Sequence, residues 1–327
     1  MSTIEGTPRV PRLLISRRAF ADKVFRGSMR TAAVAAVAIL GLIALFLVVK
    51  AMPALRRTGW SFLTEARWLP YAGHFGVAAL VSGTIAVALI AMAFALPVAF
   101  GAALFISEYA PVRLRRSLIG AVDLMAAVPS IVYGLWGFFW LQPHLIGVSR
   151  WVAVHIGDVV PFLSVRDPST PSSFTSSAFV AGVVVSVMVV PTATSVMREV
   201  FSQAPVAERE AAIALGATRW GMIRKVVLPF GRSGVVGGAM LGLGRALGET
   251  IAVYLIISPI FALTTHPLQS GTNTIAALIA AQYSEANGVG ISALFAAGLV
   301  LFLFTLVVNS IAGFVVSRSR SGAVTEI

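Results

Sequence analysis

An arginine and a glutamate lie within an apolar part of the chain, where charged residues are costly. The stretch Gly242–Thr250 reads GLGRALGET and holds Arg245 and Glu249. If this stretch is one helix, the four-residue spacing puts both side chains on one face, where they can pair. A guanidinium also matches an oxyanion such as phosphate through two parallel hydrogen bonds. The pattern predicts either an anion-binding site or a buried ion pair that only fixes helix packing.

Further polar residues accompany this pair. In the anion interpretation, Glu249 holds Arg245 when no anion is present, or accepts a bond from a protonated phosphate oxygen. Thr250 follows in the same stretch, and Ser130 follows Pro129 in another apolar segment. We predict that both hydroxyls line the substrate path, although a hydroxyl in an apolar helix can equally bond its own backbone.

A second group of residues lies in a polar connection, Phe201–Pro229. Residues Glu208–Leu215 favour a helix, and Gly216 can end that helix in a left-handed conformation. A second helix, about Arg219–Val227, is expected to stop at Pro229. A helix, a glycine turn and a second helix below a membrane bundle can dock in a groove of a partner protein. A solvated connecting loop is the alternative.

The composition excludes several kinds of chemistry. The chain has no cysteine, and its four histidines fall outside the long apolar runs. None of the three lysines follows a glycine, so the chain contains no phosphate-binding loop of the G-x-x-x-x-G-K-[ST] type. We therefore expect no bound cofactor and no metal on this chain.

The elements that position these residues are membrane spans. Hydrophobic residues make up 57% of the 327 residues and charged residues 12%, about half the charged share of a soluble domain. A net charge of +12 therefore points to anionic lipid headgroups and not to nucleic acid. Six segments reach the length of about 20 residues that a span needs: Thr31–Met52, Gly76–Ile106, Ser117–Trp140, Ser177–Met197, Ser233–Ile260 and Gly290–Val316.

The distribution of basic residues predicts the orientation. With the N-terminus in the cytoplasm, 18 Lys and Arg residues fall inside and six outside, as the positive-inside rule requires. The expected organisation is a cytoplasmic tail over 1–30, which can end in an interfacial helix around Arg18–Arg30, a transmembrane domain over 31–317 and a cytoplasmic tail over 318–327. The docking loop, about 201–230, then also faces the cytoplasm.

The connection resembles the EAA loop of ABC-importer permeases, which inserts into a cleft of the ATP-hydrolysing subunit. Val226 stands where that family commonly has isoleucine. The residues that carry the resemblance, and that it implies contact the ATPase, are Glu210, Ala211, Ala212, Gly216, Leu228 and Pro229.

Three further stretches resemble the phosphate-specific, PstC-type branch of these permeases. They are GRALGETIAV, MAAVPSIVYGLWG (Met125–Gly137) and FISEYAP (Phe105–Pro111). The resemblance implies an all-α bundle of the type I importer class in the bacterial inner membrane. It also implies that the chain forms half of a path for ATP-driven import of inorganic phosphate. The implied partners are a PstA-type second permease, a PstB-type ATPase dimer that holds ATP-Mg, and a PstS-type extracytoplasmic phosphate-binding protein.

Three other functions are weighed against this one. A permease for sulfate, molybdate or a phosphonate uses the same residue types. An integral-membrane phosphatase or transferase needs an activated nucleophile or an acid–base pair, and the apolar runs hold no histidine or cysteine. A passive channel needs no ATPase-docking loop.

Overall fold

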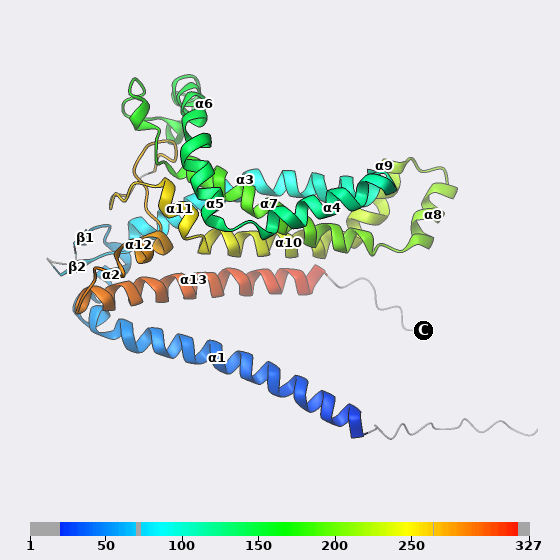
Figure 1. Ribbon diagram of the computed structural model, residues 1–327, viewed down its shortest axis with the longest axis horizontal. Coiled ribbons are helices and arrows are strands. Elements are labelled where there is room, and N and C mark those ends of the chain that lie inside the picture. The colour runs from blue at the N-terminus through cyan, green and yellow to red at the C-terminus, as the bar shows by residue number, and fades with distance from the viewer. Residues whose placement is uncertain (1–19, 70–72, 264, 320–327) are drawn as a thin grey trace, which may run out of the picture. The chain divides into compact units, whose positions relative to one another are not determined.

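The computed structural model describes residues 20–69, 73–263 and 265–319, and they are mostly helical (Figure 1). Six helical segments are long and apolar enough to cross a membrane, which confirms the predicted helical membrane bundle. These spans are Asp22–Thr58, Ala78–Tyr109, Ser130–His155, Ala178–Ser202, Arg219–Gly248 and Val289–Phe314.

The first helix, α1 (Phe20–Thr58), is uninterrupted. The chain divides into two compact units at Phe46, so the part of α1 up to that residue forms one unit and the rest of the chain the other. Residues 20–30, expected at the end of a cytoplasmic tail, are the first turns of this helix. The remainder of that predicted tail, 1–19, and positions 320–327 of the C-terminal tail lie outside the described residues.

Three helices form the centre of the larger unit. α3 (Ala78–Leu104) packs most extensively against α7 (Ala178–Ser202), and α10 (Leu228–Gly248) lies against both (Figure 1). Their facing sides bury small and branched apolar residues, among them Ala91, Val184 and Leu247. α13 (Val289–Ser319) packs along α10.

Glycines bring α10 close to α7. A Cβ atom on Gly234 would lie 2.4 Å from Val200, and one on Gly242 would lie 2.7 Å from Val189. Gly238 is similarly close to Met197, at 2.9 Å. Small residues at intervals of four let two membrane helices approach closely, and Gly238 and Gly242 lie on such a packing face.

The third span differs from the prediction. The segment predicted as one helix, Ser117–Trp140, is divided at Val128, whose backbone is extended. The residue before a proline disfavours the helical conformation, and Pro129 follows. The Tyr133 hydroxyl donates to the Met125 carbonyl across the break, at 2.8 Å. The pieces are α4 (Val112–Ala127), α5 (Ser130–Trp136), a π-helical turn η3 (Gly137–Leu141) and α6 (Gln142–His155).

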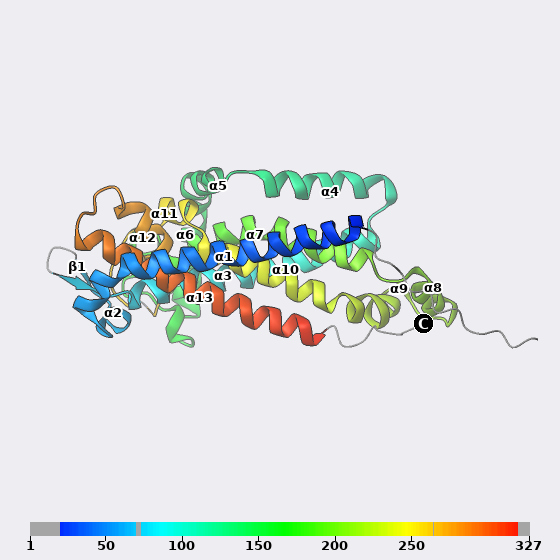
Figure 2. The same cartoon turned by 90° about the horizontal axis from the view of Figure 1, so that it is seen from below.

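The first piece, α4, is almost entirely exposed on the outside of the unit. None of its described residues is buried, and it touches the rest mainly through α7 (Figure 2). Asp123 of α4 accepts a hydrogen bond from the Ser195 hydroxyl of α7 at 3.3 Å. α4 is therefore a surface helix of this chain, with exposed apolar side chains such as Leu124.

The fifth span also differs from the prediction, because it both begins and ends earlier in the sequence. The segment Ser233–Ile260 was expected to be one helix, but α10 ends at Gly248 and Glu249 is extended. α11 (Ile251–Ile256) begins two residues later and packs against α5. A Cβ on Gly134 of α5 would lie 2.8 Å from the Ala252 Cα, so this close approach fixes α11 in its own direction.

Short elements close the end of the unit where α11 lies. Trp68 and Phe75 sit in a small hydrophobic cluster with α12 and α13, and the Trp68 indole donates to Gln282 at 2.8 Å. Hydrogen bonds from the Ser169 hydroxyl and backbone and from Thr170 hold the pKa of the exposed Asp167 below its usual range. These elements are α2 (Ser61–Thr64), β1 (Trp68–Leu69), β2 (His74–Phe75), η4 (Pro161–Leu163), η5 (Pro171–Ser173) and α12 (Ile275–Gln282).

Helical segments close the opposite end. α3 continues into a π-helical turn, η2 (Phe105–Tyr109), before it leads to α4. Between α7 and α10 the chain forms α8 (Val206–Ala214), α9 (Arg219–Met222) and a π-helical turn, η6 (Ile223–Val227).

Candidate functional site

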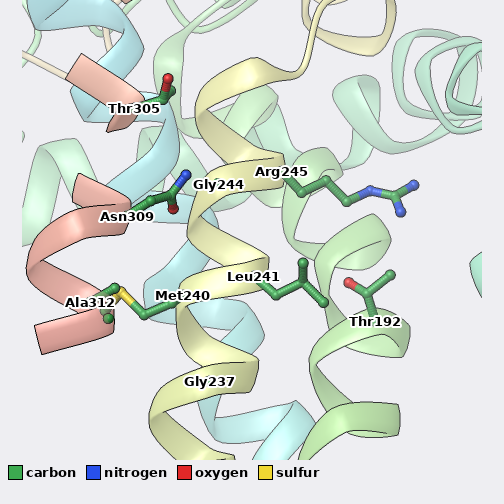
Figure 3. Close-up of a pocket in the computed structure, with 10 residues that line it drawn as sticks. Thr192, Gly237, Met240, Leu241, Gly244, Arg245, Thr305, Asn309 and Ala312 are labelled. Carbon is green, nitrogen blue, oxygen red and sulfur yellow. The ribbon is translucent and has the colours of Figure 1, made fainter. Parts of the chain in front are cut away.

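A cavity of about 880 Å³ opens among α7, α10 and α13 (Figure 3). Its wall mixes glycines, apolar side chains and a few hydrogen-bonding groups. The lining residues are Thr192, Gly237, Met240, Leu241, Gly244, Arg245, Thr305, Asn309, Ala312 and Gly313.

Arg245 is the charged residue of this wall. It lies in the last turn of α10 and is half-buried. Its side chain extends from α10 above Thr192 of α7, on the side away from Thr305 and Asn309 (Figure 3). A charge inside an apolar bundle is costly and usually marks an ion or substrate path. Since the residues lining the cavity include no carboxylate, its charge is positive and suits an anion.

The predicted pairing of Arg245 with Glu249 is wrong. The two residues do not share a helical face, because α10 ends at Gly248 and Glu249 is extended. Neither residue takes part in the ion pairs Glu65–His74 and Glu108–Arg209. The Glu249 carboxylate instead accepts from the Ala252 backbone N–H at 3.3 Å, which caps the first turn of α11. Arg245 therefore faces the cavity without a carboxylate partner.

The other two predicted path residues lie at helix starts near this break. The Thr250 hydroxyl donates to the Gly248 carbonyl at 3.0 Å, so it bonds its own backbone. Ser130 is the first residue of α5 and is half-buried. It is one turn from Tyr133, whose hydroxyl donates to the Met125 carbonyl. Neither Thr250 nor Ser130 lines the cavity, so their place in a path stays a prediction.

Four lining residues come from α13, a helix that the sequence did not connect with the site: Thr305, Asn309, Ala312 and Gly313. Asn309 approaches α10 closely, since a Cβ on Gly244 would lie 3.6 Å from its side-chain oxygen. The Thr305 hydroxyl donates to carbonyls one turn back in its own helix, at 2.9 and 3.0 Å. A lone amide within a long apolar helix was the available signal, because such residues face the interior of a bundle.

The predicted docking loop forms the helix, turn and helix that its sequence suggested. Gly216 has φ of +85°, which confirms a left-handed turn after α8. On α8, Glu210 and Ala211 are exposed and Ala212 is half-buried. Apolar side chains also face outward from this loop, with exposed fractions of 66% for Val206 and 89% for Leu215. A surface of this kind suits a protein partner.

The second helix of the loop does not stop at Pro229. α9, η6 and α10 follow one another directly, and the span runs from Arg219 to Gly248. Pro229 lies in the first turn of α10, directly after the π-helical turn, with the half-buried Leu228 before it. The wider hydrogen-bond spacing of a π turn accommodates a residue that lacks a backbone N–H. The second half of the loop, α9 and η6, is therefore continuous with α10.

No group of three or more His, Cys, Asp or Glu side chains that could hold a metal ion occurs in the described part of the chain. The site thus consists of one guanidinium, two hydroxyls and one amide within an apolar cavity.

Comparison with known proteins identifies the family of this chain. Residues 95–321 match the family model described as the inner membrane component of binding-protein-dependent transport systems. The phosphate transport system permease protein PstC of Xylella fastidiosa is 42% identical over 304 residues, which is 92% of each chain. The phosphate transport system permease protein PstC 2 of Mycobacterium tuberculosis is 41% identical over 295 residues, 89% of this chain and 90% of its own.

A solved structure shares the fold. A bacterial ABC transporter involved in the import of the acidic polysaccharide alginate matches 94% of this chain and 99% of its own, with a TM-score of 0.57 and 18% identity. This likeness supports the permease fold and says nothing of the substrate.

Proposed function

Because this chain belongs to the family of inner membrane components of binding-protein-dependent transport systems, we propose that it forms half of the path of an ATP-driven importer of inorganic phosphate. It is a multi-pass inner-membrane transporter subunit and not an enzyme. The observation that carries the proposal is Arg245 in the wall of a cavity among three membrane-spanning helices, with no carboxylate among the described residues that line it.

The cavity offers a set of donors that suits an oxyanion. The Arg245 guanidinium presents a fork of N–H groups, and Asn309 adds an amide on the other side of α10 (Figure 3). The hydroxyls of Thr192 and Thr305 donate to their own helices, at 2.8 and 2.9 Å. A fixed positive charge with few neutral donors attracts a tetrahedral anion and binds it weakly enough for release. The helix break at Glu249 supports this assignment, since transport sites are commonly built where membrane helices are discontinuous.

Phosphate is favoured over other oxyanions by the relatives, which are named as phosphate permeases. Sulfate, molybdate and phosphonate remain the competing substrates. The test is uptake by proteoliposomes that hold the complete transporter with its extracytoplasmic binding protein. We expect labelled phosphate to accumulate with ATP inside, and a tenfold excess of sulfate or molybdate to leave the rate unchanged. Accumulation of sulfate in place of phosphate would contradict the proposal.

The chain needs partners to complete the transporter. We infer a PstA-type second permease against the exposed apolar face that includes α4, with membrane lipid around the remainder. A PstS-type binding protein would deliver phosphate, and a PstB-type ATPase dimer would hold ATP-Mg. The surface of α8 that exposes Glu210, Ala211 and Val206 is the proposed ATPase dock, with Gly216, Leu228 and Pro229 shaping the loop.

We expect the α8–α9 loop to face the cytoplasm, with both termini, as the distribution of basic residues predicts. The absence of cysteine from the sequence allows a direct test with Ser172→Cys and Ser202→Cys, both at exposed positions. An impermeant thiol reagent applied to intact cells should label only the first variant. Permeabilised cells, in which both should react, are the control. Labelling of the second alone in intact cells would reverse the orientation.

A further inference from the structure

A buried carboxylate lies where α3 meets the α8–α9 loop. The Glu108 side chain, in the π-helical turn η2, is only 3% exposed. The Arg209 guanidinium of α8 lies 3.0 Å from one of its oxygens and donates to the other at 3.1 Å. The two residues are 101 positions apart in the sequence. This ion pair joins the loop to a membrane span.

Arg209 also reaches a second span. Its other terminal nitrogen donates to the Phe201 carbonyl in the last turn of α7, at 2.6 Å. In the described part of the chain, the side-chain hydrogen bonds from α8 to other elements all come from Arg209. One guanidinium therefore ties α8 to α3 and α7, which form the most extensive helix–helix interface of the unit.

The second helix of the loop is held at the same place. Arg219, the first residue of α9, donates to the Glu108 carbonyl and lies over the Tyr109 ring, 4.9 Å from its centre. We call Glu108, Arg209 and Arg219 the loop clamp. Through it, both helices of the loop meet η2, so the loop cannot shift without pulling on the end of α3.

The clamp is placed at a deformable part of the span. In η2 the Ala110 N–H bonds the Phe105 carbonyl, five residues back, at 2.8 Å. Single π-helical turns within α-helices often occur at functional sites. A buried ion pair adds little net stability compared with apolar packing, and such pairs are best attested as devices that fix a register or a switch. Both facts favour a role in coupling over one in simple stabilisation.

We propose that Glu108 and Arg209 are positioning residues for transport, which carry the displacement of the ATPase-docking loop into α3 and α7. This inference rests on the proposed docking of the ATPase at α8. Without the pair, the loop would still bind the ATPase, but its movement would no longer reach the spans. The transporter would then hydrolyse ATP with little import.

The experiment measures phosphate imported per ATP hydrolysed, in proteoliposomes with the complete transporter. Glu108→Gln and Arg209→Gln are each expected to lower this ratio at least tenfold, whereas the ATPase subunit still co-purifies. Glu199→Gln is the matched control, since it removes an exposed carboxylate at the same end of the unit, with one 3.3 Å hydrogen bond from Gln203. Its ratio should equal that of the parent.

Two double variants separate coupling from folding. Glu108→Leu with Arg209→Met leaves no buried charge unpaired, so it should restore the amount of protein in the membrane but not the ratio. Glu108→Arg with Arg209→Glu keeps opposite charges and should recover at least part of the ratio. A parental ratio in the apolar double variant would overturn the proposal and leave only a structural ion pair. If the ATPase subunit co-purifies equally well with the Gly216→Pro variant, the proposed docking site is wrong. The ratio of phosphate imported to ATP hydrolysed in the clamp variants would still test the coupling.

Discussion

Replacement of Arg245 by glutamine is expected to abolish phosphate import, while the protein remains in the membrane near its parental level. The cavity would keep its volume but lose the charged group of its wall. Each hydrogen bond to a charged group contributes about 1.5–3 kcal/mol, and about 1.4 kcal/mol corresponds to tenfold. Loss of two such bonds to phosphate therefore predicts a fall of about a hundredfold or more in uptake per transporter.

Replacement of the same residue by lysine tests the geometry of the interaction. Arg245→Lys keeps the charge, but an ammonium is a point charge and cannot present two parallel N–H groups to one anion. Uptake should therefore recover only in part. Equal activity of the lysine variant and the parent would show that charge alone suffices.

The control for Arg245→Gln is Arg232→Gln, which removes an exposed guanidinium from the same helix, α10. This variant should transport at the parental rate. Protein level in the membrane and co-purification of the ATPase subunit are measured for both variants, so that a folding defect is not read as lost transport.

The broken helix at Glu249 changes how the pair Arg245 and Glu249 should behave. A buried ion pair broken on one side would cost about 3–5 kcal/mol, and a neutral double variant would recover it. Since the two residues are not paired, we expect Arg245→Gln with Glu249→Gln to transport no better than Arg245→Gln alone. Near-parental uptake by this double variant would support an ion pair between the two residues and contradict an anion-binding site at Arg245.

The sequence predicted the bundle well because its signals are local. Each signal lies within a short stretch of sequence: an apolar run, a glycine directly after a helix-favouring segment, as at Gly216, or two glycines four residues apart. The left-handed turn at Gly216 and the close packing at Gly238 and Gly242 were predictable for this reason. The break at Val128 was also accessible, since Pro129 constrains the residue before it.

The features that the sequence did not predict depend on distant contacts. Gly248 and the capping carboxylate of Glu249 lie at the break between α10 and α11, but the packing of α11 against α5, with Gly134 close to Ala252, is a distant contact. The clamp joins Glu108 to Arg209 across 101 positions. Asn309 reaches the cavity only because α13 packs along α10. Such partners are set by how the helices pack, which a single sequence does not encode in any short pattern.

Gly216 gives the second large expected effect. Gly216→Pro should uncouple the permease from its ATPase, because proline fixes φ near −65° and the turn requires +85°. We expect the ATPase subunit to co-purify poorly, and uptake to fall to background. The change Glu210→Lys with Ala211→Glu, on the exposed side of α8, should have a similar effect through the docking surface and not through the turn.

A graded series at Gly216 separates backbone geometry from side-chain contact. A Cβ there would meet no atom within 4 Å, so steric contact within this chain cannot explain a defect. Gly216→Asn should be well tolerated, since asparagine visits the left-handed region, and Gly216→Ala should cost about 1–2 kcal/mol in the turn. The matched control is Gly288→Ala, at an exposed glycine with φ of +51° and equally open space. If the turn positions the ATPase dock, coupling should fall in the order glycine, asparagine, alanine, proline at position 216 and stay unchanged at 288. Parental import by Gly216→Pro would show that the loop does not dock the ATPase in this conformation.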